Sequence, residues 1–322
     1  MFNSSEPHLD RTTKLFIDKL EAAASKPLYE LSPQAAREFL INLQRETYEE
    51  IEADVVDTFI NVEDIGEVDV RFVRPKESND KMLPMILYLH GGGWILGDKE
   101  SHDMLVRKLA NCTNSVVVYV NYSHSPESVF PIAINEAYGV LEYLSRKAKD
   151  YNIDSRKIVV AGDSAGGNMA VAICLKSKIE NGPKISYQVL LYPVIDSKMN
   201  TESYNEFKNG PWLSKKAMEW FWNAYVPNKT LRNDRYISPL NVENSILKGL
   251  PSTLIVVAEN DVLRDEGELF ARKLDEAGVE VTSVRINNTH HDFLMLNALQ
   301  KSNPAKAALN LVCGMICSSY NK

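Results

Sequence analysis

From residue 84 onward, short apolar runs alternate with segments whose apolar residues follow helical spacing. Strands buried on both faces have continuous apolar sequences, and helices between them allow parallel pairing. The alternation therefore predicts an α/β fold, with a mostly parallel sheet flanked by helices on both faces. Two earlier runs, 55–62 and 68–73, bring the expected sheet to eight strands. The later strand-like runs are 85–89, 115–120, 157–161, 187–192, 253–258 and 281–286, and the helical segments include 102–111, 133–150, 168–179 and 266–277.

The bulk composition is that of an ordinary globular chain with a large core: 322 residues, 44 % of them hydrophobic and 25 % charged. A net charge of −7 without a basic cluster argues against nucleic acid as a partner. No apolar stretch is long enough to span a membrane, and residues 1–10 lack the basic start and apolar core of a secretory signal. The four cysteines, Cys112, Cys174, Cys313 and Cys317, form no C-x-x-C pair. We interpret them as scattered buried thiols, which predicts a cytoplasmic location.

A glycine-rich turn, Gly162-Asp163-Ser164-Ala165-Gly166, separates the apolar run 157–161 from the helical segment 168–179. This is the nucleophile-elbow pattern, in which a serine stands out from a tight turn between a strand and a helix. Small residues are needed there because the strand and the helix approach closely, and the helix start directs N–H groups at the serine. An ordinary glycine-rich turn is the alternative interpretation of this motif alone.

A second motif, His90-Gly91-Gly92-Gly93-Trp94, follows the apolar run 85–89. Glycines at the end of a strand expose N–H groups without a Cβ, as an oxyanion hole requires. A flexible loop or a phosphate-binding loop is the alternative. The spacing does not fit G-x-G-x-x-G, and no Gly-Lys-Ser/Thr closes the run. The two motifs together favour acyl-transfer chemistry.

A serine nucleophile needs a histidine base oriented by a carboxylate, in the chain order Ser, Asp or Glu, His in this type of fold. Asp261 follows the run 253–258 and is the preferred acid, with Asp196 as second choice. Asp265 is expected to cap the helix that begins beside it. Only His290 and His291 lie downstream, and spacing does not choose between them. His90 is expected to brace the glycine loop, and His102 and His124 to be ordinary polar or surface residues.

One segment, 197–240, interrupts the alternation between two core strands and is rich in aromatic residues. Together with the helical residues 1–50 it is expected to form a cap over the carboxyl edge of the sheet, while 51–196 and 241–322 form the two parts of the core. Such a cap would wall a pocket for the substrate. We expect Trp94, Asp163, Trp212 and Phe221 to line this pocket.

Taken together, four stretches resemble the hormone-sensitive-lipase-like family of α/β-hydrolases, which includes bacterial acetyl esterases and short-chain carboxylesterases. They are 90–94, 162–167, 261–267 and 291–293. The resemblance implies that Ser164 is the nucleophile, Asp261 the orienting acid and His291 the base. It also implies an oxyanion hole formed by the N–H groups of Gly92, Gly93 and Ala165, and it allows a homodimer through 281–286.

The chain departs from the family pattern in three places, of which Val262, where proline is common, carries little weight. Asp292 stands where the family usually has glycine, so a carboxylate beside the base is expected to raise its pKa or to hold water. The family's Arg-Leu-Ala-Pro-Glu run appears as Ser-His-Ser-Pro-Glu at 123–127, which lacks a structural arginine.

The sequence therefore predicts a serine carboxylesterase that hydrolyses short-chain acyl esters through an acyl-enzyme, with a small-molecule ester as substrate and neither metal nor organic cofactor. One alternative is an amidase, arylformamidase or deacetylase with the same three residues. The other is a ligand-binding protein on a hydrolase scaffold, as in the plant gibberellin receptor. That receptor has lost its catalytic histidine, whereas this chain keeps all three residues.

Overall fold

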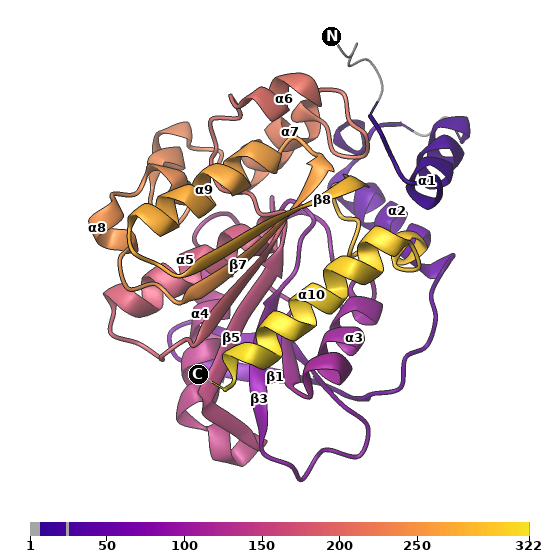
Figure 1. The fold of residues 1–322 in the computed structure, drawn as a ribbon. Coiled ribbons are helices and arrows are strands. Elements are labelled where there is room, and N and C mark those ends of the chain that lie inside the picture. The colour runs from indigo at the N-terminus through magenta and orange to yellow at the C-terminus, as the bar shows by residue number, and fades with distance from the viewer. Residues whose placement is uncertain (1–6, 24–25, 322) are drawn as a thin grey trace.

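The computed structural model describes residues 7–23 and 26–321, so residues 1–6 of the predicted non-secretory start lie outside the described part. Its centre is one sheet of eight strands in the order β1-β2-β4-β3-β5-β6-β7-β8 (Figure 1), which confirms the predicted number. The strands are β1 (Asp54–Val62), β2 (Gly66–Arg74), β3 (Leu83–Leu89), β4 (Val116–Val120), β5 (Ile153–Asp163), β6 (Tyr187–Leu191), β7 (Ser252–Asn260) and β8 (Val281–His290).

Strand pairing is antiparallel only at the β1–β2 and β2–β4 contacts and parallel from β4 to β8. The central strands β3, β4 and β6 are buried along almost their whole length, which explains their continuous apolar sequences. In the register of the sheet, Leu89 of β3 pairs with Gly162 of β5. The two glycine motifs therefore leave neighbouring strands at the same level and at the same edge of the sheet.

Helices cover both faces of the sheet (Figure 1). α3 and α10 contact each other, as do α4 and α5. α4 ends at Arg146 and a short 3-10 turn follows, so the predicted segment 133–150 is a helix over most but not all of its length. The helices are α3 (Asp103–Thr113), α4 (Ile132–Arg146), α5 (Ala165–Ile179), α8 (Asn244–Leu247), α9 (Arg264–Glu276) and α10 (Asn303–Ser319).

The remaining helices gather at the carboxyl edge of the sheet, where the N-terminal segment meets the segment between β6 and β7 (Figure 1). They are α1 (Arg11–Ala22), the 3-10 turn η1 (Leu28–Glu30), α2 (Pro33–Arg45), α6 (Glu202–Glu206) and α7 (Lys215–Tyr225). Ser32 caps α2 by accepting a hydrogen bond from Ala35 N at 3.2 Å, as the Ser-Pro start predicts. η1 and α7 contact each other, so two segments distant in sequence form one roof.

The interpretation of the cysteines as unpaired thiols is wrong for two of them. Cys112 at the end of α3 and Cys313 in α10 form a disulfide across 201 residues of sequence, with their Cα atoms 5.9 Å apart. The packing of α3 on α10 brings them together, which no local spacing indicates. Cys174 and Cys317 are free. In the described part of the chain, no helix combines the length and apolar character that crossing a membrane requires.

Candidate active site

Ser164 lies at the sharp turn between β5 and α5. Its φ of 52° and ψ of −118° place it in a backbone conformation that residues other than glycine rarely adopt. The flanking glycines are required by close approach, since a Cβ on Gly166 would overlap the carbonyl oxygen of Leu89 and one on Gly162 that of Gly166. The turn thus holds the hydroxyl of Ser164 at the carboxyl edge of the sheet.

His291 links Ser164 to Asp261. Its Nε2 lies 2.8 Å from Oγ of Ser164, and its Nδ1 lies 2.7 Å from Oδ2 of Asp261. The other oxygen of Asp261 accepts a hydrogen bond from Leu263 N at 3.0 Å, which fixes the carboxylate. All three side chains are buried. The predicted serine, acid and base, 97 and 30 residues apart, therefore form one continuous hydrogen-bonded chain.

The second candidates for acid and base lie elsewhere. Asp196 accepts hydrogen bonds from Lys198 N and from the side chain of Asn241, and it does not contact His291. His290 turns away, with Nδ1 bonded to the carbonyl of His291 and its ring packed against both Phe16 and Trp212. Burial lowers the pKa of His290 to about 4, so this ring is neutral.

The pKa of His291 is raised to about 9. Burial alone would lower it, but the attraction of the carboxylates of Asp261 and Asp292 outweighs this desolvation. An imidazolium is therefore more stable here than in water, and the ring accepts a proton readily.

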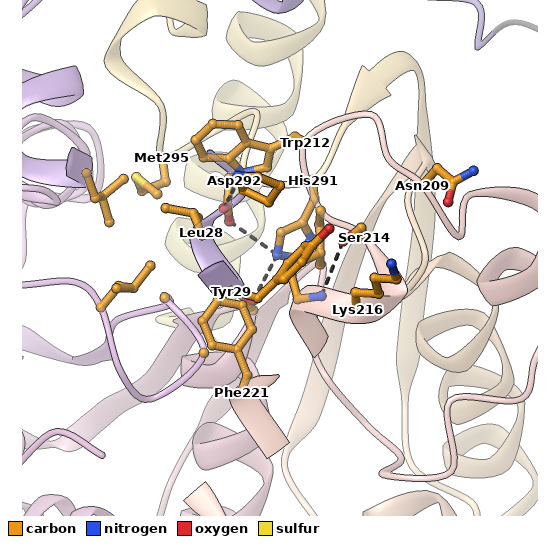
Figure 2. Close-up of a pocket in the computed structure, with 18 of the residues that line it drawn as sticks. Leu28, Tyr29, Asn209, Trp212, Ser214, Lys216, Phe221, His291, Asp292 and Met295 are labelled. Carbon is orange, nitrogen blue, oxygen red and sulfur yellow. Dashed lines mark hydrogen bonds and ion pairs between the residues drawn. The ribbon is translucent and has the colours of Figure 1, made fainter. Parts of the chain in front are cut away.

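Asp292 lies on the cavity side of His291. Its Oδ1 is 3.3 Å from Nε2 of His291 and has no hydrogen-bond partner among the described residues, while its Oδ2 accepts a hydrogen bond of 2.8 Å from the indole of Trp212. Figure 2 shows the dashed contacts of Asp292 with both rings. Burial raises the pKa of Asp292. Two carboxylates therefore flank the imidazole, one at each nitrogen.

Two glycines of the loop after β3 line the same cavity as Ser164. Gly92 and Gly93 have φ of 104° and 60°, and a Cβ on Gly93 would overlap the ring of Phe221. Within residues 7–23 and 26–321, the N–H groups of Gly92, Gly93 and Ala165 donate no hydrogen bond to the protein. Three free donors thus lie around Ser164, at the N-terminus of α5 and on the glycine loop.

Asp163 does not line the cavity, contrary to the sequence prediction. It is fully buried and accepts hydrogen bonds from Gly91 N at 3.0 Å and from the hydroxyl of Tyr88 at 2.7 Å. Nε2 of His102 lies 3.3 Å from its other oxygen. The expectation that His102 is an ordinary polar or surface residue is therefore wrong: it is buried, and it meets the carboxylate that anchors the glycine loop.

His90 braces this loop. Its Nδ1 lies 2.8 Å from the carbonyl of Gly91, and its ring stacks on Tyr122 with centroids 4.0 Å apart. Burial places its pKa well below the usual range for histidine, so the ring is neutral and serves as a packing element.

Trp94 does not line the cavity either, contrary to the prediction. Its side chain is fully buried, stacked on Tyr225 at 4.2 Å and tilted against Trp222 at 4.7 Å. Both partners belong to α7, so Trp94 joins the glycine loop to the roof. Gly92 and Gly93 of the same loop line the cavity instead. The aromatic content of the segment 197–240 is partly explained by this contact.

A cavity of about 290 Å³ opens above Ser164. Trp212 and Phe221 line it as predicted, together with His291, Asp292, Gly92 and Gly93. Sequence reasoning did not identify the other lining residues, because they come from segments that meet only in the folded chain. They are Pro27, Leu28, Tyr29, Leu40, Leu96, Lys208, Asn209, Leu213, Ser214, Lys216, Ala217 and Met295.

Arg37 of α2 contacts the run 123–127, which lacks the family's arginine. Its Nε donates to the carbonyl of Ile95 at 2.8 Å, and one terminal nitrogen donates to the carbonyl of Ser125 at 3.0 Å. The same guanidinium forms a two-pronged ion pair with Glu127, and this pair holds the pKa of Glu127 at about 2. No signal in the sequence connects Arg37 with this loop.

The prediction that Asp265 caps the helix beside it is wrong. α9 begins at Arg264 with Leu263 as its cap, so Asp265 lies inside the first turn, where it accepts a hydrogen bond from Ser203 N at 2.7 Å. Among the residues that the structure describes, no group of three or more His, Cys, Asp or Glu is arranged to hold a metal ion.

Comparison with known proteins agrees with this geometry. The family described as having the alpha/beta hydrolase fold matches residues 86–295. An esterase of Gibberella moniliformis is 36 % identical over 282 residues, which are 87 % of this chain and 88 % of the relative. An ethyl acetate hydrolase of Pseudomonas putida is 31 % identical over 249 residues, 76 % of this chain and 77 % of the relative.

Solved structures give the same result. The crystal structure of a thermostable esterase from Pseudomonas putida superposes with a TM-score of 0.95 at 39 % identity, covering 98 % of this chain and 99 % of that one. A fungal esterase from Rhizomucor miehei gives a TM-score of 0.91 at 32 % identity, with 98 % of each chain covered. The chain belongs to the hormone-sensitive-lipase-like family of α/β-hydrolases.

Proposed function

We propose that this protein is an esterase that hydrolyses carboxylic esters, with Ser164 as nucleophile, His291 as base and Asp261 as the orienting acid. The observation that carries the proposal is the unbroken chain of two short contacts from the hydroxyl through the imidazole to the carboxylate. A serine hydroxyl becomes a competent nucleophile when a base within hydrogen-bond reach removes its proton. The esterases among the relatives and solved structures agree with this class of reaction.

In the proposed reaction, Oγ of Ser164 attacks the ester carbonyl while Nε2 of His291 takes its proton. The imidazolium is stabilised by Asp261, and it then gives the proton to the departing alcohol. Water, activated by the same Nε2, attacks the acyl-enzyme, frees the acid and restores Ser164. No step in this sequence needs a metal or an organic cofactor.

We assign the N–H groups of Gly92, Gly93 and Ala165 to the tetrahedral oxyanion. Their lack of acceptors within the described residues and their position around Ser164 support this role. Because these donors belong to rigid backbone, they are oriented before the reaction, which is how such sites lower the barrier.

The preferred acyl groups are short. A cavity of about 290 Å³ lies at the lower end of the size range for small-molecule pockets. Phe221 and Met295 are among the side chains that bound it. An acetyl or butyryl group fits such a space, whereas a palmitoyl chain would need the roof to move.

The decisive experiment compares wild type with Ser164→Ala on 4-nitrophenyl esters from acetate to palmitate. Wild type should hydrolyse the acetate and butyrate best, and the variant should lose at least about 10⁴-fold in kcat, as removal of a catalytic serine does elsewhere. An organophosphate should label wild type at Ser164 and spare the variant. Full activity in the variant, or faster cleavage of matched aryl amides than of esters, would contradict the proposal.

Three further proposals concern the cap, the oligomeric state and the cellular location. We propose that residues 1–50 and 197–240 act together as the cap over the core parts 51–196 and 241–322, which limited proteolysis with and without inhibitor would test. A homodimer through 281–286 stays a prediction, which light scattering would test.

The predicted cytoplasmic location was inferred from unpaired cysteines. The disulfide between Cys112 and Cys313 removes that support, since disulfides are typical of oxidising compartments. Cell fractionation would test it.

A further inference from the structure

Two lysines line the cavity above Ser164: Lys208, just after α6, and Lys216, in the first turn of α7. Both side chains are exposed. Within the described ranges, no hydrogen bond or ion pair involves the Nζ of either lysine. Two free ammonium groups therefore lie at the cavity of a chain whose net charge is −7.

The backbone brings these two lysines to the same part of the rim. Lys215 N donates a hydrogen bond of 3.0 Å to the carbonyl of Lys208, which ties together the two ends of the loop 208–215. Figure 2 shows Asn209, Ser214 and Lys216 on one side of the cavity and Leu28 and Met295 on the other. The positive charge is thus concentrated on one side of the opening.

The other charges of the lining do not cancel this field at the rim. Asp292 is the only carboxylate among the described residues that line the cavity. It lies deep, buried beside Nε2 of His291, with burial raising its pKa and one oxygen engaged by Trp212. The rim therefore carries two lysines, whereas the carboxylate of the lining lies at the floor, paired with the imidazole of His291.

The loop 208–215 lies on the side of the site where the alcohol would leave. Trp212, within this loop, donates to Asp292, and Asp292 lies 3.3 Å from Nε2 of His291. In the proposed reaction, Nε2 hands its proton to the leaving alcohol. In the same reaction, the acyl carbonyl oxygen would face the N–H groups of Gly92 and Gly93, which also line the cavity.

We propose that Lys208 and Lys216 select esters whose alcohol half carries an anionic group, such as a carboxylate, several bonds from the scissile oxygen. This inference rests on the proposed esterase function and adds the class of substrate. The lysines bind the remote charge alike in the ground state and the transition state, so their contribution appears in KM rather than in kcat.

The test uses two acetate esters of the same shape: 4-acetoxybenzoate, which is anionic, and 4-isopropylphenyl acetate, which is neutral. The readout is the ratio of their kcat/KM values, so that the intrinsic reactivity of each ester cancels between enzymes. Each exposed charge pair contributes about two- to fivefold, so the double variant Lys208→Gln/Lys216→Gln should lower the ratio by about tenfold. Raising the salt concentration should lower the wild-type ratio and leave that of the variant unchanged.

Lys215→Gln is the matched control, because Lys215 carries the same charge in the same helical turn and does not line the cavity. It should keep the wild-type ratio. An unchanged ratio in the double variant, or an equal fall in Lys215→Gln, overturns the proposed selection while the esterase function stands. Failure of wild type to hydrolyse either ester overturns the esterase function, and the selection with it.

Discussion

Replacing Asp292 by Asn should make the enzyme more active at neutral pH. The base proposed for the reaction, His291, can act only when neutral, and its pKa of about 9 keeps most of it protonated at pH 7. Asp292 contributes to this shift because its Oδ1 faces Nε2 at 3.3 Å. Asparagine has the same shape and can still accept the hydrogen bond of Trp212, so the substitution removes little besides the charge.

The size of the effect follows from this distance. Opposite unit charges 3.3 Å apart attract by about 1.3 kcal/mol even at the dielectric constant of water, and by more in a buried site. About 1.4 kcal/mol corresponds to one pKa unit. Asp292→Asn should therefore lower the pKa of His291 by about one unit or more, and below that pKa the neutral fraction should rise about tenfold.

The assay is the pH dependence of kcat/KM for 4-nitrophenyl acetate, whose acid limb reports the base in the free enzyme. In wild type kcat/KM should rise with pH up to about 9. In the variant this rise should occur at a pH about one unit lower. Asp265→Asn is the control, since it removes a carboxylate near the same edge of the sheet without contact to His291. If the acid limb of folded Asp292→Asn lies at the same pH as in wild type, or at a higher pH, the electrostatic argument is refuted.

Two further predictions concern stability. Gly166→Ala should destabilise the protein by about 3 kcal/mol or more, because the new Cβ overlaps the carbonyl of Leu89 in a packed turn. Gly314→Ala, in open space within α10, should instead stabilise by about 0.5–1 kcal/mol; thermal unfolding of both variants checks the pair, and equal melting temperatures would count against it. Cys112→Ser should lower the free energy of unfolding in urea by about 2–4 kcal/mol through loss of a cross-link spanning 201 residues. Cys317→Ser should be near neutral, and an unchanged midpoint in Cys112→Ser would show that the bond adds no stability.

The sheet could be predicted because its information is local. Strands such as β4 and β6 are buried along their whole length and carry continuous apolar runs, and the tight turn at Ser164 needs glycines that are visible in five residues. The order of Ser164, Asp261 and His291 then follows from the topology of such a sheet. These features depend on neighbours in sequence or on rules common to the fold.

What escaped prediction depends on contacts between distant segments. Trp94 and Asp163 belong to the motifs, but Trp94 packs on α7 and Asp163 binds the backbone of the glycine loop, and neither contact is visible in the motif itself. His102 pairs with a carboxylate 61 residues away, and Cys112 bonds to Cys313 across 201 residues. Single spacings carry no sign of such pairs, so only the assembled fold identifies them.

The side chain of Arg37 ties the N-terminal segment to two loops beside the candidate active site. One guanidinium joins α2 to the backbone just after the glycine loop and to the strand connection at 123–127. A chain shortened past α2 would remove the donor of four acceptor oxygens, those of Ile95, Ser125 and the Glu127 carboxylate, and would take Leu40 from the cavity wall. Removing or exchanging the N-terminal segment should therefore disturb the loops that Arg37 holds, and a replacement segment would need an equivalent cation at this position.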